Sequence, residues 1–217
     1  MNKYKYLLFD MDGTIADTDE MLIQSMNILY DKYRDGVRTP IEQLYYFSGP
    51  PIAGTLKKEF PNMDNDFMMQ EFSRVSKELY PSTIKSYPHC REVLLDFKSK
   101  GIKLGVVTNK MRQMTLYCLK LIDLDDIFDV VIGYDDVKNG KPHQEGILKA
   151  LDILNAKDLS EALYVGDNKI DLDTANNAGI DCALVAWGPR VLPNDINPTF
   201  KFMSYEDLRR KIYEWHL

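Results

Sequence analysis

The chain has 217 residues, of which 45% are hydrophobic, and its formal net charge is −6. This length supports a sizeable hydrophobic core and a subsidiary domain, and the composition excludes a disordered or fibrous protein. The acidic balance argues against nucleic-acid binding, which depends on clustered lysine and arginine side chains.

Neither a secretory signal nor a membrane segment is predicted. The chain begins with a strand-like run at 4–9, which is too short for the apolar part of a signal peptide. No apolar stretch is long enough to cross a bilayer. The three cysteines, Cys90, Cys118 and Cys182, are odd in number and lack metal-ligand spacing, a pattern typical of free thiols in a reducing compartment. We therefore expect a cytoplasmic protein without disulfide bonds.

An apolar run at 6–9 predicts the first strand, and a helical insertion follows it. From about 17 to 80 no strand periodicity occurs, but two helical faces do, and Pro81 and Pro88 bracket the return to the sheet. We expect residues 16–81 to form a small α-helical cap domain. The two helical faces consist of Leu22, Met26, Leu29 and Tyr33, and of Met68, Phe72, Val75 and Leu79.

Strands and helices alternate in the rest of the chain. Continuous apolar runs are typical of buried parallel strands, which crossover helices connect. Residues 1–15 and 82–217 are therefore expected to form an α/β, Rossmann-like core with an open parallel sheet. The later apolar runs are 102–107, 130–132, 162–165 and 182–186, and the helical patterns are 92–100, 111–121, 143–154 and 171–178.

Asp10 and Asp12 directly follow the first strand, and Gly13 comes next. Because glycine lets the backbone turn sharply, both carboxylates can face a crevice at the carboxyl end of the sheet, where open α/β folds bind ligands. Such a pair suits a cation site, or a nucleophile with a general acid/base. A polar turn with an aspartate helix cap is the alternative interpretation.

Thr108, Asn109 and Lys141 suggest a phosphate site. Thr108 and Asn109 stand between a strand and a helix, where they could cap the helix or offer a hydroxyl and N–H groups to phosphate. Lys141 stands at the start of the helix at 143–154, where its charge meets the positive end of the helix dipole. A nearby anion would remove this conflict, and a solvated surface lysine is the alternative.

A second acidic pair, Asp167 and Asp171, follows the strand at 162–165. Their spacing of four residues can place both side chains on one face of a helix, where like charges repel unless a cation lies between them. Asp167 could instead cap the helix. Acidic groups at strand ends suit Mg²⁺ and oxygen ligation far better than zinc.

Acid, hydroxyl, lysine and acid at successive strand ends, in this order, resemble the four motifs of the haloacid dehalogenase superfamily, from residue 4 to about 186. The insertion after the first motif resembles that superfamily's small helical cap. The runs 12–18, 48–51 and 165–168 are most similar to phosphoglycolate phosphatases and related bacterial pyrophosphatases. The resemblance implies a Mg²⁺-dependent phosphatase.

The resemblance also implies a covalent mechanism. Asp10 would attack phosphorus and form an aspartyl-phosphate, while Asp12 would protonate the leaving oxygen and then activate water. Lys141→Ala is expected to fold normally and to lose transition-state binding. The implied phosphate-binding residues are Thr108, Asn109 and Lys141, and the implied Mg²⁺ ligands are Asp10, the Asp12 backbone carbonyl and Asp167, with Asp171 as a ligand or behind the ligands.

The expected substrate is a small phosphorylated metabolite similar to phosphoglycolate, and nothing demands more than a monomer. Inorganic pyrophosphate is the alternative within the subgroup, and a sugar-phosphate mutase similar to β-phosphoglucomutase is another. Those mutases commonly carry valine where this chain has Thr14, which favours hydrolysis. A phospho-receiver signalling module also uses Asp, Thr and Lys at strand ends. The two acidic pairs and the inserted cap argue against it.

Overall fold

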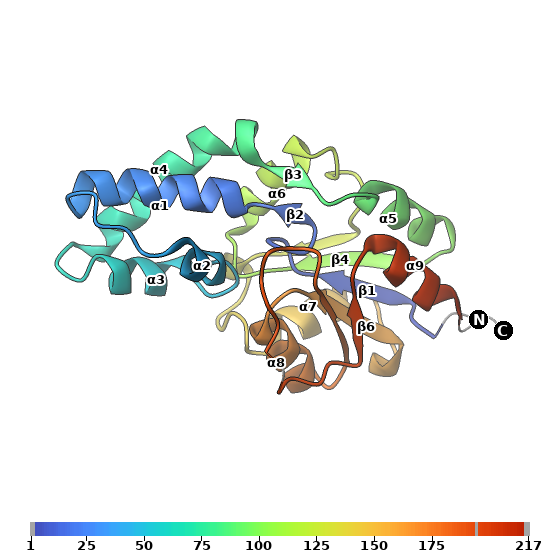
Figure 1. Ribbon diagram of the computed structural model, residues 1–217. Helices are drawn as coiled ribbons and strands as arrows, with labels where there is room; N and C mark the ends of the chain where they lie inside the picture. The colour runs from blue at the N-terminus through green and yellow to red at the C-terminus, as the bar shows by residue number, and fades with distance from the viewer. Residues whose placement is uncertain (1–2, 194, 215–217) are drawn as a thin grey trace.

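The computed structural model describes residues 3–193 and 195–214. Figure 1 shows a sheet with helices on both faces and a helical region to one side of it. This helical region is called the cap below, and the remainder is called the core. The cap contains α1 (Asp19–Tyr33), α2 (Ile41–Leu44), the short 3-10 helix η1 (Tyr45–Phe47), α3 (Ile52–Glu59) and α4 (Asn65–Thr83).

A parallel sheet of six strands, in the order β5-β4-β1-β6-β7-β8, forms the centre of the described core, so the predicted α/β fold is confirmed. Phe9 of β1 pairs with Val106 of β4 and with Val165 of β6. The residues after these three strands therefore meet at one edge, where the strand order reverses and open sheets bind ligands. The strands are β1 (Tyr6–Phe9), β4 (Lys103–Val107), β5 (Val130–Ile132), β6 (Ala162–Gly166), β7 (Asp181–Val185) and β8 (Phe200–Phe202).

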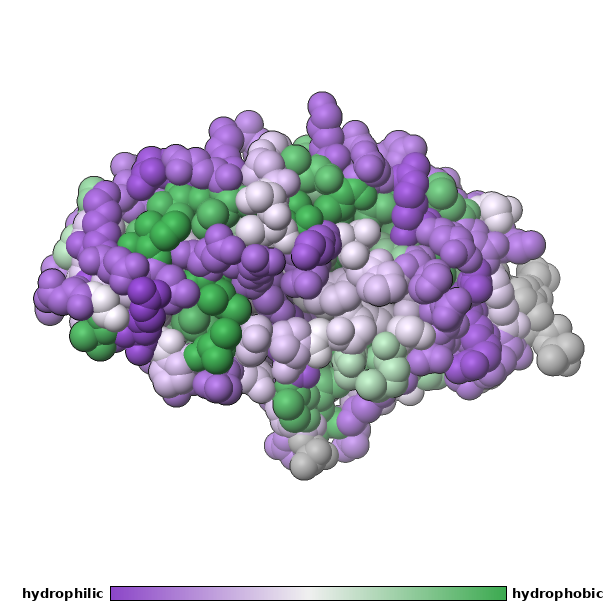
Figure 2. Space-filling model, turned by 45° about the horizontal axis from the view of Figure 1, so that its top comes forward, coloured by the Kyte–Doolittle hydropathy of each residue, from purple (hydrophilic) through white to green (hydrophobic). Residues whose placement is uncertain are grey.

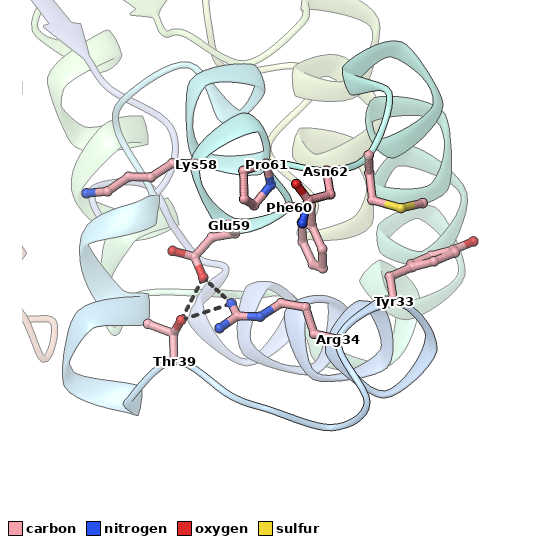
Figure 3. A pocket seen from close by; sticks show the side chains of 9 residues that line it. Tyr33, Arg34, Thr39, Lys58, Glu59, Phe60, Pro61 and Asn62 are labelled. Carbon is pink, nitrogen blue, oxygen red and sulfur yellow. Dashed lines mark hydrogen bonds and ion pairs between the residues drawn. The ribbon is translucent and has the colours of Figure 1, made fainter.

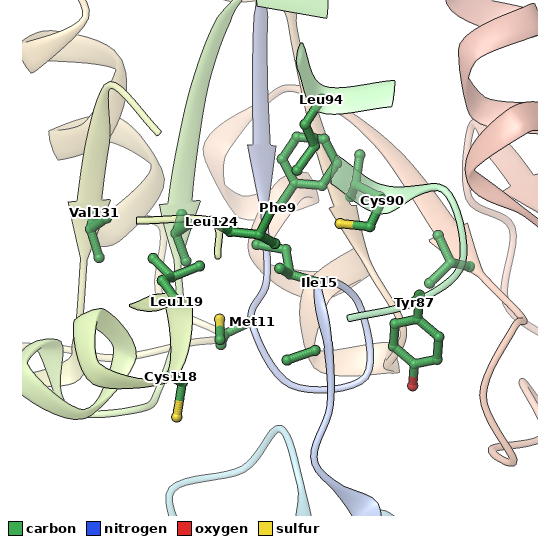
Figure 4. Packing of buried hydrophobic residues seen from close by; sticks show 14 of the residues in the cluster. Phe9, Met11, Ile15, Tyr87, Cys90, Leu94, Cys118, Leu119, Leu124 and Val131 are labelled. Carbon is green, nitrogen blue, oxygen red and sulfur yellow. The ribbon is translucent and has the colours of Figure 1, made fainter. Parts of the chain in front are cut away.

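Successive strand side chains point to opposite faces of the sheet, and each face carries a helical layer. Leu7 and Phe9 pack on the face covered by α5, α6 and α9, whereas Leu8 and Tyr164 pack on the face covered by α7 and α8. Figure 4 shows Phe9 within the first cluster. The core helices are α5 (Cys90–Ser99), α6 (Arg112–Leu121), α7 (Glu145–Ile153), α8 (Lys169–Ala178), α9 (Tyr205–Glu214) and the 3-10 helices η2 (Tyr134–Asp136) and η3 (Leu159–Glu161).

The cap is held together mainly by α1 and α4, which lie side by side in Figure 1. Both predicted helical faces point inward, since Met26 and Met68 are fully buried. Asp64 caps α4 by accepting a hydrogen bond of 2.8 Å from the N–H of Phe67. Helix α4 continues through Pro81 to Thr83, and the chain leaves the cap between Pro81 and Pro88, as expected.

The cap and the core are connected through a small antiparallel ribbon. Strand β2 (Ala16–Asp17) pairs with β3 (Lys85–Ser86), with Asp17 opposite Lys85. The chain therefore enters and leaves the cap at neighbouring points.

A polar network closes the end of the cap that is far from the sheet. Figure 3 shows Glu59 beside Thr39 and Arg34, at a cavity of about 450 Å³. Glu59 accepts hydrogen bonds of 2.6 Å from Thr39, 2.7 Å from Arg34 and 2.8 Å from Tyr30. This network ties the end of α1 and the following loop to the end of α3.

Two elements at the end of the chain, β8 and α9, were not predicted. Strand β8 extends the sheet beside β7, and α9 buries Leu208 and Ile212. Within the described residues, every helix is too short or too polar to cross a bilayer. The three cysteines are buried and have free thiols, as expected.

Candidate active site

The carboxylates of Asp10, Asp167 and Asp171 come together at the carboxyl edge of the sheet. Each offers one oxygen, and these oxygens all lie within 4.8 Å of one another. All three residues are buried. The loop after Asp10 passes directly over Asp167, because a Cβ atom on Gly13 would lie 2.1 Å from Asp167 Oδ2. Only glycine leaves space there, and its φ of +81° also favours glycine.

Lys141 lies inside this cluster. Its Nζ is 2.8 Å from Asp10 Oδ1 and 2.7 Å from Asp171 Oδ1. Its side chain is 2% exposed, which rules out the surface-lysine alternative. The lysine thus supplies one of the cations that the repelling carboxylates require.

Asp171 supports the loop that carries Asp167. Its Oδ2 accepts hydrogen bonds from the backbone N–H groups of Asp167 at 3.1 Å and Asn168 at 3.0 Å. Its Oδ1 accepts from Lys141. With both oxygens engaged, Asp171 is better placed to hold the loop and the lysine than to donate to a further cation.

The site shifts the proton affinities of its members. Burial raises the pKa of Asp10 to about 6 although Lys141 opposes the shift, and Asp171 adds to it. Burial also raises the pKa of Asp167 to about 8, against the opposing effect of Arg190. Burial alone would lower the pKa of Lys141, but the charges of Asp10 and Asp171 raise it. The buried carboxyl groups of Asp10 and Asp167 therefore hold protons more tightly than exposed aspartates do, and a bound cation would oppose this effect.

Asp12 faces the cap and is held by groups that sequence reasoning missed. Lys110 Nζ donates to both of its carboxylate oxygens, at 2.8 and 2.9 Å, and Thr18 Oγ1 donates to Oδ1 at 2.8 Å. Lys110 also donates to Tyr80 Oη in α4 at 2.7 Å. The only sequence signal for Lys110 is its position directly after Asn109.

Thr108 and Asn109 lie beside the cluster at the end of β4. Thr108 is buried. Asn109 uses its side chain for support, since Oδ1 accepts from the N–H of Lys141 at 2.9 Å and Nδ2 donates to the carbonyl of Gly49 at 3.0 Å. Helix α6 begins only at Arg112, so neither residue caps it.

A cleft of about 580 Å³ opens between this cluster and the cap. Its polar floor includes Asp10, Asp12 and Thr108, and the described lysines that line it are Lys77 and Lys110. The apolar walls of the cleft include Met21, Leu22, Phe47, Ile52, Met69, Phe72, Met111 and Met114.

Hydrophobic residues also reach the outer surface of the cap in patches, on the left of Figure 2.

Arg190 completes the site and was not predicted. It is 7% exposed and lies in the loop after β7. Its Nη1 is 2.5 Å from Asp167 Oδ2, and its Nη2 is 2.5 Å from Asp19 Oδ1. The sequence around it, 186–199, has no helical or strand periodicity that would indicate where its side chain points.

The donor set fits a magnesium ion. Carboxylate oxygens are hard ligands, which Mg²⁺ prefers. Asp10, Asp167 and Asp171 are buried, and each directs one oxygen to a point where the three oxygens lie within 4.8 Å of one another. A divalent cation held by these oxygens would offset the repulsion between the carboxylates.

The chain is similar in sequence and in fold to several known proteins. A family model described as haloacid dehalogenase-like hydrolase matches residues 7–185. Pyrophosphatase PpaX from Bacillus cereus (strain B4264) is 37% identical over 182 residues, covering 83% of this chain and 82% of that protein. A Bacteroides fragilis structure, assigned provisionally to the haloacid dehalogenase-like hydrolases, has a TM-score of 0.86 and 25% identity, covering 94% of this chain and 99% of that one. A predicted phosphoglycolate phosphatase from Haemophilus somnus shares the fold, with a TM-score of 0.84 and 20% identity over 97% of this chain and 99% of that one.

Proposed function

The chain belongs to the haloacid dehalogenase-like hydrolases, and from this premise we propose that it hydrolyses a phosphate compound through an aspartyl-phosphate on Asp10. The placement of Asp10 carries the proposal. It follows the central strand, lines the cleft and lies against Lys141 and a second buried carboxylate. A carboxylate so placed can attack a phosphoryl group that enters from the cleft.

Positive charge must offset the approach of Asp10 to a phosphate dianion. Lys141 supplies part of it at 2.8 Å. Mg²⁺, when bound, would supply the rest by neutralising charge between the nucleophile and phosphate. We assign its ligands to Asp10, the Asp12 backbone carbonyl and Asp167, with Asp171 behind them. Thr108 and the backbone N–H of Asn109 would hold the transferring oxygens.

Asp12 is proposed as the general acid and base. It is the second carboxylate on the cleft floor, two residues from Asp10, and Thr18 and Lys110 hold it in place. From there it can protonate a leaving oxygen and later take a proton from the attacking water. The apolar walls of the cleft limit bulk water around these steps.

We further propose that residues 16–81 act as a separate cap domain, and that residues 1–15 and 82–217 form the catalytic core. The two-stranded ribbon of β2 and β3 lies at this boundary. The cap supplies most of the apolar walls of the cleft and so would select the substrate.

We propose pyrophosphate, and not phosphoglycolate, as the preferred substrate. The support is the 37% identity to pyrophosphatase PpaX over most of both chains. Lys77 and Lys110 on the cleft would favour an anionic leaving group. A sugar-phosphate mutase uses the same nucleophile and differs in the acceptor of the phosphoryl group.

A phosphate-release assay tests the substrate. Pyrophosphate, phosphoglycolate, a hexose phosphate and nitrophenyl phosphate are compared at equal concentration with Mg²⁺, and pyrophosphate is expected to give the highest kcat/KM. Phosphate transfer to a sugar hydroxyl that outpaces phosphate release would favour the mutase. If the protein hydrolyses none of these compounds, the proposed function is contradicted.

The covalent step is tested with Asp12→Asn and nitrophenyl phosphate, whose leaving group needs little protonation. Turnover should fall by about 10²- to 10⁴-fold, because the water loses its base. A phosphoryl group should then accumulate on the peptide that contains Asp10. Acid quench and mass spectrometry detect it, and hydroxylamine should remove it. The absence of this adduct in both the wild type and the variant would contradict the covalent mechanism.

A further inference from the structure

The guanidinium of Arg190 donates hydrogen bonds to acceptors on three separate segments of the chain. Nη1 contacts Asp167 Oδ2 at 2.5 Å, Nη2 contacts Asp19 Oδ1 at 2.5 Å, and Nε donates to the carbonyl of Tyr45 at 2.7 Å. Asp167 belongs to the acidic cluster of the core. Asp19 is the first residue of α1, and Tyr45 begins η1, so both belong to the cap. One buried side chain thus joins the acidic cluster to two parts of the cap.

The arrangement depends on the shape of arginine. Its planar fork presents several donors in fixed directions, which a lysine ammonium on its flexible stem cannot reproduce. The core is built closely around the fork, since a Cβ atom on Gly13 would lie 2.4 Å from Arg190 Nη1. The side chain is therefore fixed against the loop that carries Asp10 and Asp12.

We propose that Arg190 is a positioning residue that couples cation binding at Asp167 to docking of the cap. The inference rests on the proposed function, because it takes Asp167 as a ligand of Mg²⁺. A ligating carboxylate needs a partner that fixes its orientation, and loss of such partners weakens metal binding. Because the same guanidinium also holds Asp19 and Tyr45, a docked cap stabilises the orientation of Asp167. By linkage, a bound cation stabilises the docked cap to the same extent.

The first experiment compares Arg190→Met with the wild type in a calorimetric titration with Mg²⁺ alone. The Kd for Mg²⁺ is expected to rise about 10- to 100-fold, the usual effect of removing a group that orients a ligand. Arg34→Met is the matched control, because Arg34 makes its ion pair with Glu59 in the cap, away from the cluster. It should leave the Kd unchanged. An Arg190→Met Kd within about twofold of the wild type would overturn the proposal.

Hydrogen exchange then tests the coupling itself. In the wild type, Mg²⁺ should slow amide exchange at the start of α1 and in η1. In Arg190→Met these amides should exchange rapidly both with and without Mg²⁺. A residue that merely stabilised the fold would speed exchange without removing the response to Mg²⁺. Persistence of that response in the variant would therefore overturn the coupling.

A second variant covers the case in which Arg190→Met fails to fold. Asp19→Ala removes one cap contact and keeps the contact with Asp167. It should weaken Mg²⁺ binding about 5-fold or more, the lower end of typical coupling between sites, and should speed exchange in the first turn of α1. An unchanged Kd would overturn the coupling. If the wild type hydrolyses phosphate compounds without binding Mg²⁺, the coupling inference fails but the proposed nucleophile does not. If the wild type binds Mg²⁺ but hydrolyses no phosphate compound, the proposed function fails but the coupling does not.

Discussion

Lys141→Met should destabilise the protein strongly when no metal is present. Its Nζ lies within 2.8 Å of Asp10 and Asp171, and these side chains are 1% and 0% exposed. Removing one member of a buried ion pair costs about 3–5 kcal/mol, because the remaining charge is buried without a partner. Here two carboxylates lose their partner at once. The expectation that Lys141→Ala folds normally therefore gives way to a loss of about 3–5 kcal/mol in the free energy of unfolding.

The loss should depend on pH and on metal. Protonation of Asp10 should make the cost smaller at pH 5 than at pH 8, since burial raises its pKa to about 6 even in the presence of Lys141. Mg²⁺ should restore part of the stability by replacing the missing charge. Urea unfolding at pH 5 and 8, with Mg²⁺ or with a chelator, measures these effects. Lys138→Met is the control, because Lys138 is exposed.

The full loss of stability is expected at pH 8 in chelator. A loss below about 1 kcal/mol, which is the upper end for exposed ion pairs, would show that Lys141 is not the buried partner of these carboxylates. An equal loss at both pH values would show that their charge is not the cause.

Three further outcomes are expected. Excess chelator should abolish phosphate release, and full activity in chelator would exclude the metal assignment. The metal-free wild type should lose stability as the pH rises from about 4 to about 8. The reason is that Asp10 and Asp167 retain protons in the folded protein, whereas in the unfolded chain they release them near pH 3.8. Unfolding curves measured with Mg²⁺ should show a weaker dependence on pH. His89→Gly should raise the free energy of unfolding by about 1 kcal/mol. His89 has a φ of +61°, and this left-handed conformation costs a residue with a Cβ atom about 1 kcal/mol relative to glycine. An unchanged or lower urea midpoint of unfolding would contradict this prediction.

The sheet and the acidic cluster could be predicted because both follow local rules. Apolar runs bounded by polar residues mark the ends of β1, β4 and β6, and parallel strands bring those ends together. Asp10, Thr108 and Asp167 therefore had to lie near one another once the strands were recognised. The superfamily resemblance is confirmed by the family match over residues 7–185.

Other features depend on tertiary contacts that no local pattern records. Arg190 lies in an irregular loop, and its partners, Asp19 and Asp167, are far away in sequence. Strand β8 has only three residues, and it is formed by parallel pairing with β7. Pro81 lies in the last turn of α4, where one missing N–H breaks few helical hydrogen bonds, so packing outweighs its usual effect.

The ribbon of β2 and β3 brings the two ends of the proposed cap domain together. Asp17 and Lys85 are paired neighbours, so the two ends of any inserted segment start from the same place. An insertion of different length or shape could be exchanged there without changing the order of the strands or the register between them. Substrate range could thus diversify by recombination at this junction while the nucleophile, the lysine and the acidic loop remain as they are. A segment grafted from a relative between these two residues is expected to alter selectivity when it keeps the equivalents of Thr18, Asp19 and Tyr80, because these side chains contact Asp12, Arg190 and Lys110 of the core.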